Sequence, residues 1–121
     1  MVMETLKTLS EEKQLFQAIF DDSFEPIIIT NRKKIVVEIN SIACDLLGHT
    51  RDELLNHSLI KIFPTSFTKS RKRKGEVEVK HKNGQTQTVA FRWGRLKLPH
   101  YKLLFLKDLT QSRQAANELY Q

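Results

Sequence analysis

The stretch "IVVEINSIACDLLGHTRDELLNHSLIKIFP", residues 35–64, changes its hydrophobic pattern at Asn40. The β-branched run before Asn40 is typical of a strand. The residues after it are typical of a short helix, which Asn40 or Ser41 can cap at its start. Gly48 can end that helix in the left-handed conformation that glycine tolerates. The stretch therefore predicts a strand that leads directly into a helix.

Two further helical turns complete the same stretch. Thr50 and Glu53 have the spacing of a capping box, in which each residue satisfies an exposed backbone N–H of the other. "SLIKIF", residues 58–63, is a third apolar turn that Pro64 brings to an end. A cluster of short helices is expected here.

Upstream, a helix and a hairpin are expected. Thr8 and Glu11 form another capping box, so that a helix should run from there to about Asp21. "PIIIT", residues 26–30, and "IVVEI", residues 35–39, read as paired strands. Between them, "NRKK" can turn with Asn31 in a left-handed conformation.

Downstream, the pattern changes to a period of two after the basic run 69–74. Val77 and Val79 alternate with charged residues, as in a strand with one wet face. Asn83–Gly84 is a strong hairpin signal. A second long strand follows, then a last strand over 101–108.

The resulting order is helix, two strands, a helical cluster, three strands and a final helix. This order predicts an α+β fold, with a five-stranded antiparallel sheet and the short helices on one face. We divide the chain into an N-terminal amphipathic flanking helix (1–22), a core (23–110) and a C-terminal linker helix (111–121).

Several motifs, in this order, resemble the PAS family of sensory domains. In the second of them, the Asn before a small-residue helix that ends in Leu-Gly is matched by Asn40, Ala43, Leu47 and Gly48. A terminal Asp-hydrophobic-Thr pattern is matched by residues 108–110. The resemblance spans about residues 12–112, and the similar segments are 15–31, 35–64, 77–93 and 104–110.

The chain departs from the family between Pro64 and Gly75. Most family members place a longer helix and a loop there, which form one wall of a ligand pocket. Here "TSFTKSRKRK", residues 65–74, allows about two helical turns. The resemblance therefore implies a pocket that is small or closed.

An enzymatic role is not expected. The sequence contains no recognisable Gly-rich phosphate loop, nucleophile elbow or Cys-His pairing. Asp21, Asp22 and Glu25 lie at a helix end without a suitable partner. Metal-ligand spacing is absent from the four histidines, which are His49, His57, His81 and His100.

Neither haem nor a photoactive flavin is expected as a cofactor. Haem-binding family members use a histidine in the segment after Pro64, and this chain has none there. Flavin photosensors of the family carry a reactive cysteine where "NHSLIKIF", residues 56–63, stands here. The single cysteine, Cys44, reads as a small buried residue.

A small apolar ligand is the alternative to a core that its own side chains fill, and we favour the filled core. The space between the sheet and the helices should be lined by some of the following residues: Ile29, Val37, Leu47, Leu55, Ile60, Phe63, Phe67, Val79, Phe91 and Leu104.

The net charge of +6 and the pI of about 9.6 permit binding to nucleic acid or to an anionic membrane. Much of the excess lies in residues 69–74, however, and such a run is usually a solvated loop. The alternation around Phe91 and Trp93 places these rings toward the core, not on a base-stacking surface. We expect no nucleic-acid partner and no membrane segment, and one cysteine suits the cytoplasm.

The resemblance implies a homodimer that forms through the N-terminal helix and a sheet face. Leu9, Phe16 and Phe20 are the interface candidates, and Asp108 and Thr110 would relay a signal to the outgoing helix. We expect a sensory and dimerisation module of a cytoplasmic signalling protein. Its output domain, outside this chain, could be a histidine kinase, a cyclic-dinucleotide enzyme or a transcription regulator. A ligand-free structural or docking module is the alternative, and a basic nucleic-acid binder is a third.

Overall fold

The structure, a computed structural model, describes the backbone of residues 2–95 and 100–109 and the side chains of residues 11–95 and 100–109. Within these ranges, five strands form one antiparallel sheet, as expected. The strands are β1 (Ile27–Asn31), β2 (Val36–Ile39), β3 (Lys74–Lys80), β4 (Thr86–Arg95) and β5 (Tyr101–Asp108). Their order across the sheet is β2-β1-β5-β4-β3, so that β5, the last of these five in the sequence, lies at its centre.

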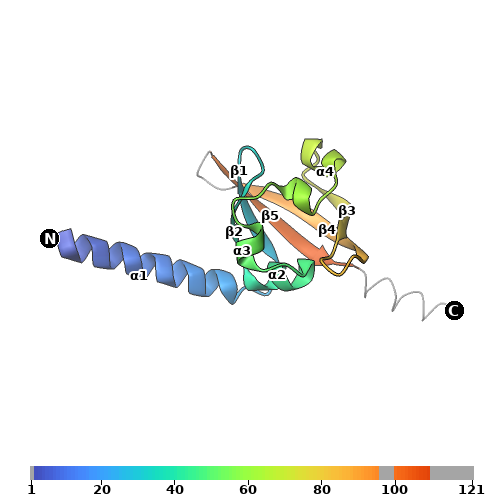
Figure 1. Cartoon of the computed structure of the whole chain (residues 1–121). Coiled ribbons are helices and arrows are strands. Elements are labelled where there is room, and N and C mark those ends of the chain that lie inside the picture. The colour runs from blue at the N-terminus through green and yellow to red at the C-terminus, as the bar shows by residue number, and fades with distance from the viewer. Residues whose placement is uncertain (1, 96–99, 110–121) are drawn as a thin grey trace.

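The short helices cover one face of this sheet, whereas the first helix extends away from it (Figure 1). The covering elements are α2 (Ser41–Leu47), α3 (Arg51–Leu54), the 3₁₀ helix η1 (Leu59–Lys61) and α4 (Thr65–Lys69). The first helix, α1, spans Val2–Asp21. The expected C-terminal helix over 111–121 lies outside the described residues.

Asn40 joins the sheet to the helices through its side chain. Its Oδ1 accepts hydrogen bonds from the backbone N–H of Ile27, at 3.0 Å, and from that of Ala43, at 3.1 Å. Its Nδ2 donates to the carbonyl oxygens of Phe20, at 3.1 Å, and Glu25, at 2.8 Å. The residue is 0% exposed. One buried amide thus holds the end of α1, the start of β1 and the first turn of α2.

The helix boundaries in residues 40–55 agree with the sequence prediction. Asn40 is the N-cap of α2, and Gly48 follows the helix with a φ of 74°. Thr50 and Glu53 form the expected capping box at α3. Gly48 has a second role, because a Cβ there would lie 2.2 Å from the ring of His81.

Two local predictions are wrong. The helix α1 begins at Val2, so Thr8 and Glu11 lie inside it and do not start it. In the first hairpin the left-handed residue is Lys34, with a φ of 62°, and not Asn31. The Asn31 side chain instead accepts hydrogen bonds from the backbone N–H of Lys33 and Ile35, which bends the chain from within the turn.

Glu53 fastens α3 to the loop between β3 and β4. Its carboxylate pairs with Lys82 at 2.7 Å and with His49 at 3.1 Å. Hydrogen bonds from Lys82, and then from His49, lower the pKa of Glu53 to about 2. Because its folded-state pKa lies below the ordinary 4.5, this contact stabilises the fold above about pH 4.5, and the stabilisation is lost as the pH falls toward 2.

The face of the sheet that the helices leave bare also carries apolar side chains. Ile27 faces Phe105, and Ile29 faces Leu103, across the β1–β5 pair. Arg92 lies over the Phe105 ring at 4.1 Å from its centroid. No helix of the described residues covers this face (Figure 1).

We expect Asn40→Ala to lower the free energy of unfolding by about 2–4 kcal/mol, because it removes an N-cap and leaves buried backbone groups unpaired. Thr50→Ala, which removes an exposed cap, should cost about 1 kcal/mol. Urea denaturation of both variants checks this. Equal losses would contradict the central position of Asn40.

We expect Glu53→Gln to lower the melting temperature at pH 7 and to lower it much less near pH 2, where the folded wild-type carboxylate becomes protonated and most of the stabilisation is lost. Thermal melts of the variant and the wild type across this range measure the difference. A difference that stays constant with pH would show that the charge of Glu53 contributes nothing.

Candidate functional site

Aromatic side chains fill the space between the helices and the sheet. Phe67 of α4 stacks on Phe63 with ring centroids 4.6 Å apart, and meets Phe91 edge-on at 4.8 Å. On a third side it lies 6.1 Å from Trp93, with the two rings nearly parallel. Phe63 and Phe67 are buried. The short helix α4 therefore places the Phe67 ring in the interior, between the other helices and the sheet.

Six of the ten predicted lining residues belong to the buried core: Leu47, Phe63, Phe67, Val79, Phe91 and Leu104. Leu55 is partly buried and packs against this core. Neither of the two cavities described below is lined by any of the ten. Whether this part of the fold takes an apolar ligand stays a prediction.

For the other three residues the predicted position is wrong. Ile29 and Val37 are half-buried outside the core cluster, whereas their neighbours Ile28 and Val36 are buried in it. Ile60 is 57% exposed. The runs "IIIT" and "IVVEI" are apolar at consecutive positions, so a period of two does not tell which residues face the helices. A register shift between Ile29 and Thr30 displaces the pattern further.

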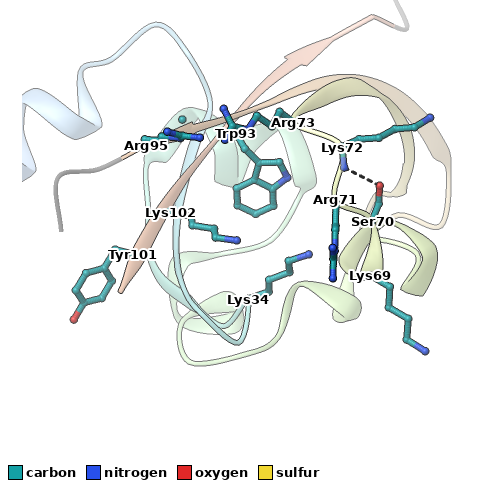
Figure 2. A pocket seen from close by; sticks show the side chains of 11 residues that line it. Lys34, Lys69, Ser70, Arg71, Lys72, Arg73, Trp93, Arg95, Tyr101 and Lys102 are labelled. Atoms are coloured by element: carbon teal, nitrogen blue, oxygen red, sulfur yellow. Dashed lines mark hydrogen bonds between the residues drawn. The ribbon is translucent and has the colours of Figure 1, made fainter. Parts of the chain in front are cut away.

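A cavity of about 550 Å³ opens beside this core, and we name it the basic groove. Its walls come from the first hairpin, from α4 with the loop after it, and from the ends of β4 and β5 (Figure 2). The lining residues are Lys34, Lys69, Ser70, Arg71, Lys72, Arg73, Trp93, Gly94, Arg95, Tyr101 and Lys102. Seven of these eleven side chains are cationic, and none is acidic.

Local structure brings the cations together. In the loop after α4 the Ser70 hydroxyl accepts a hydrogen bond of 3.1 Å from the backbone N–H of Lys72 (Figure 2). The backbone N–H of Trp93 donates to the carbonyl of Arg73 at 2.7 Å, which holds the end of the basic run against β4. Across the sheet, Arg95 lies directly opposite Lys102.

The indole of Trp93 lies at the centre of the basic groove (Figure 2). The ammonium of Lys34 is 5.8 Å from its ring centroid, and that of Lys102 is 6.0 Å away. Lys34 also donates a hydrogen bond to the carbonyl of Thr68. Burial, and then the charge of Lys102, lower the pKa of Lys34 from its usual value. Two ammonium groups thus share one aromatic ring.

The sequence revealed only part of this groove. The basic run 69–74 was visible, and we expected a solvated loop. That Lys34, Arg95 and Lys102 join it depends on the hairpin turns and on the register of β4 with β5. The sequence did contain one signal for the groove. If the last two strands pair, Arg95 lies opposite Lys102, and a like-charge pair of this kind lowers stability unless it has another role.

A second cavity, of about 640 Å³, lies where the flanking segments meet the core. Asp108, one of the two predicted relay residues, lines it, and Thr110 lies outside the described residues. The lining residues are Phe24, Glu25, Pro26, Ile42, Asp45, Leu46, Leu106, Lys107 and Asp108. The connection from α1 to β1 and the end of β5 therefore form walls of one cavity.

The predicted interface residues on α1 differ in exposure. Phe16 is 47% exposed, whereas Phe20 is buried and stacks on it with ring centroids 5.3 Å apart. The side chain of Leu9 lies outside the described residues. Leu15, Ile19 and Phe24 are also exposed, so an apolar stripe continues along the helix and past its end.

Other sites are not favoured by the described residues. In the ranges described, no three His, Cys, Asp or Glu side chains gather so that they could hold a metal ion. None of the described helices is long and apolar enough to cross a membrane. Burial, and then the charge of Asp45, raise the pKa of the Cys44 thiol, which keeps it in its less reactive protonated form.

Solved structures with similar folds are PAS domains from signalling proteins. That of an HTR-like protein from Haloarcula marismortui has a TM-score of 0.67 at 20% identity, covering 88% of this chain and 98% of that one. That of a two-component sensor histidine kinase has a TM-score of 0.67 at 13% identity, with 82% and 97% covered. A domain of a sensory box sensor histidine kinase/response regulator from Geobacter sulfurreducens has a TM-score of 0.65 at 20% identity, with 83% and 96% covered.

At these identities the solved structures show the fold alone, and a search of curated proteins found no match. The family itself is shown by sequence, because the family model described as "PAS fold" matches residues 14–103. That match covers most of the chain, and it agrees with the sheet order and the helical cluster described above. As its motifs predicted, the chain belongs to the PAS family of domains, which are generally sensory and non-catalytic.

Proposed function

We propose that this PAS domain is a homodimeric signalling module that passes a conformational change between its core and its flanking segments. The observation that carries the proposal is the position of α1, which leaves the domain with an exposed apolar stripe while Asn40 holds its end to the core. The output domain lies outside this chain. In keeping with the sequence, we place the parent protein in the cytoplasm, as a histidine kinase, a cyclic-dinucleotide enzyme or a transcription regulator.

The exposed stripe supports association of two copies. Leu15, Phe16 and Ile19 recur at helical spacing on one side of α1, and 47–65% of each is exposed. Apolar side chains gathered on a single helix face are typical of interaction surfaces, whereas scattered ones are not. The bare sheet face offers a second apolar surface, around Phe105 and Leu103. A two-fold axis that packs α1 of one copy against the bare sheet face of its partner would cover the apolar stripe and the sheet face together.

The contacts of Asn40 support transmission of a signal. Its amide binds the carbonyl of Phe20 at the end of α1 and the N–H of Ala43 in α2, so a shift of α2 must move or break contacts with α1. At the same end, the α1–β1 connection and Asp108 both line the second cavity. Small movements of α2 can therefore reach both flanking segments without unfolding the sheet.

The aromatic cluster supports a core that works without haem or flavin. Phe67 lies with its ring centroid 4.6 Å from that of Phe63 and 4.8 Å from that of Phe91, and close packing of this kind supports a core that its own side chains fill. We therefore propose that the signal is a change of conformation or of partner contacts, and that the domain has no enzymatic activity of its own.

We expect Phe16→Glu/Ile19→Glu to shift the protein from dimer to monomer, because two charges would be placed in the apolar stripe. Gln14→Glu/Ala18→Glu adds the same charge on the other side of α1 and should leave the dimer intact. Light scattering with size-exclusion chromatography measures the mass. A monomeric wild type, or equal behaviour of the two variants, would exclude this dimer.

We expect the purified wild type to be colourless and to show, by native mass spectrometry, the mass of its polypeptide chains with no bound adduct, because the aromatic side chains fill the core. A stoichiometric adduct that survives repeated preparations would contradict the filled core.

A further inference from the structure

The basic groove is not explained by dimerisation or by signal transmission. It lies beside the core, against which Trp93 packs, and its lining includes neither Leu103 nor Phe105 of the bare sheet face on which the proposed dimer depends. Its cations come from segments that are far apart in sequence, so the fold itself gathers them. Such an arrangement requires a physical reason, because like charges in proximity lower stability.

The electrostatic cost is visible at two points. Arg95 and Lys102 occupy directly opposed positions on β4 and β5, where an oppositely charged pair would have been favourable. Lys34 is only partly exposed, and its ammonium is disfavoured by its burial and by Lys102. The three ion pairs found among the described residues involve none of the seven groove cations. An anion bound in the groove would attract each of these cations and so offset their mutual repulsion.

We propose that the basic groove binds a small anion that carries two or more phosphate groups, such as an inorganic polyphosphate or a nucleoside triphosphate. Its volume of about 550 Å³ falls within the roughly 300–1,000 Å³ of small-molecule sites. Arginine and lysine donors are those that phosphate oxygens prefer, and Arg71, Arg73 and Arg95 offer planar, two-pronged donors.

The concave shape favours a small ligand over a flat or extended one. Lys34 and Lys102 extend toward the indole of Trp93 at the centre of the groove, from opposite segments of the fold, whereas Lys72 points away from it (Figure 2). A membrane surface or a nucleic-acid backbone would reach the outer lysines but not the two ammonium groups beside the indole. A compact polyphosphate can contact both sets at once.

Trp93 makes this proposal directly testable, since it is the only tryptophan of the chain and lies in the groove. Binding of sodium tripolyphosphate should change its fluorescence saturably at low ionic strength, and added potassium chloride should weaken the binding. Calorimetry gives an independent dissociation constant. Orthophosphate should bind at least about tenfold more weakly, because it engages fewer cations.

Two matched variants distinguish specific binding of tripolyphosphate in the groove from nonspecific attraction to the positive charge of the protein. Arg71→Glu/Lys102→Glu reverses two exposed groove cations, one of them beside the indole, and should raise the dissociation constant for tripolyphosphate by about tenfold or more. Lys61→Glu/Lys80→Glu makes the same change in net charge at exposed positions outside the groove and should change it less than about threefold. Melting curves confirm that both variants are folded.

A nucleoside triphosphate serves as a further probe. Binding equal to that of tripolyphosphate would assign recognition to the phosphates alone, and tighter binding would add a contact with the nucleoside, so either result supports the proposal. The Phe16→Glu/Ile19→Glu variant should bind as the wild type does, which keeps this test independent of the dimer. The proposal is overturned by the absence of saturable binding, by equal losses in the two double variants, or by binding to anionic vesicles or single-stranded DNA without binding to tripolyphosphate.

Discussion

The side chain of Asn40 is the contact on which the rest of this fold depends. It makes four hydrogen bonds, it is fully buried, and its partners belong to the end of α1, the connection to β1, β1 itself and α2. A buried amide with all its hydrogen-bonding groups paired is costly to replace, because each lost bond leaves a backbone group without water or partner. The same residue ends β2 and caps α2, so it fixes where the sheet stops and where the helical cluster begins.

The shortness of α4 determines how the interior is used. Its one turn places Phe67 between Phe63, Phe91 and Trp93, and these rings pack against one another between the helices and the sheet. The basic residues at the end of α4 and in the loop after it form a wall of the basic groove. Trp93 belongs to both regions, because it packs against the core through Phe67 and lies beside the ammonium groups of Lys34 and Lys102. The filled core and the basic groove therefore share one side chain.

The sequence predicted the features that neighbouring residues determine. The caps at Asn40, Thr50 and Gly48, the antiparallel strands and the family all follow from local patterns, and all are confirmed. It failed where the answer depends on distant residues. Ile28 and Ile29 are equally apolar, and only the packed helices decide that Ile28 is the buried one. The groove could not be predicted as a whole, because its cations meet through the turn at Lys34 and the register of β4 with β5.

The link from the core to α1 is most directly tested by the dimer dissociation constant of Asn40→Ala, measured by analytical ultracentrifugation at a temperature where the variant is folded. Asn40 contacts the end of α1 through the carbonyl of Phe20, and because it is fully buried it contributes nothing to the exposed stripe itself. If it couples the helix to the core, its loss should weaken the dimer by about tenfold, the size of a typical coupling between sites. A dissociation constant equal to that of the wild type would contradict this coupling and leave Asn40 with a purely structural role.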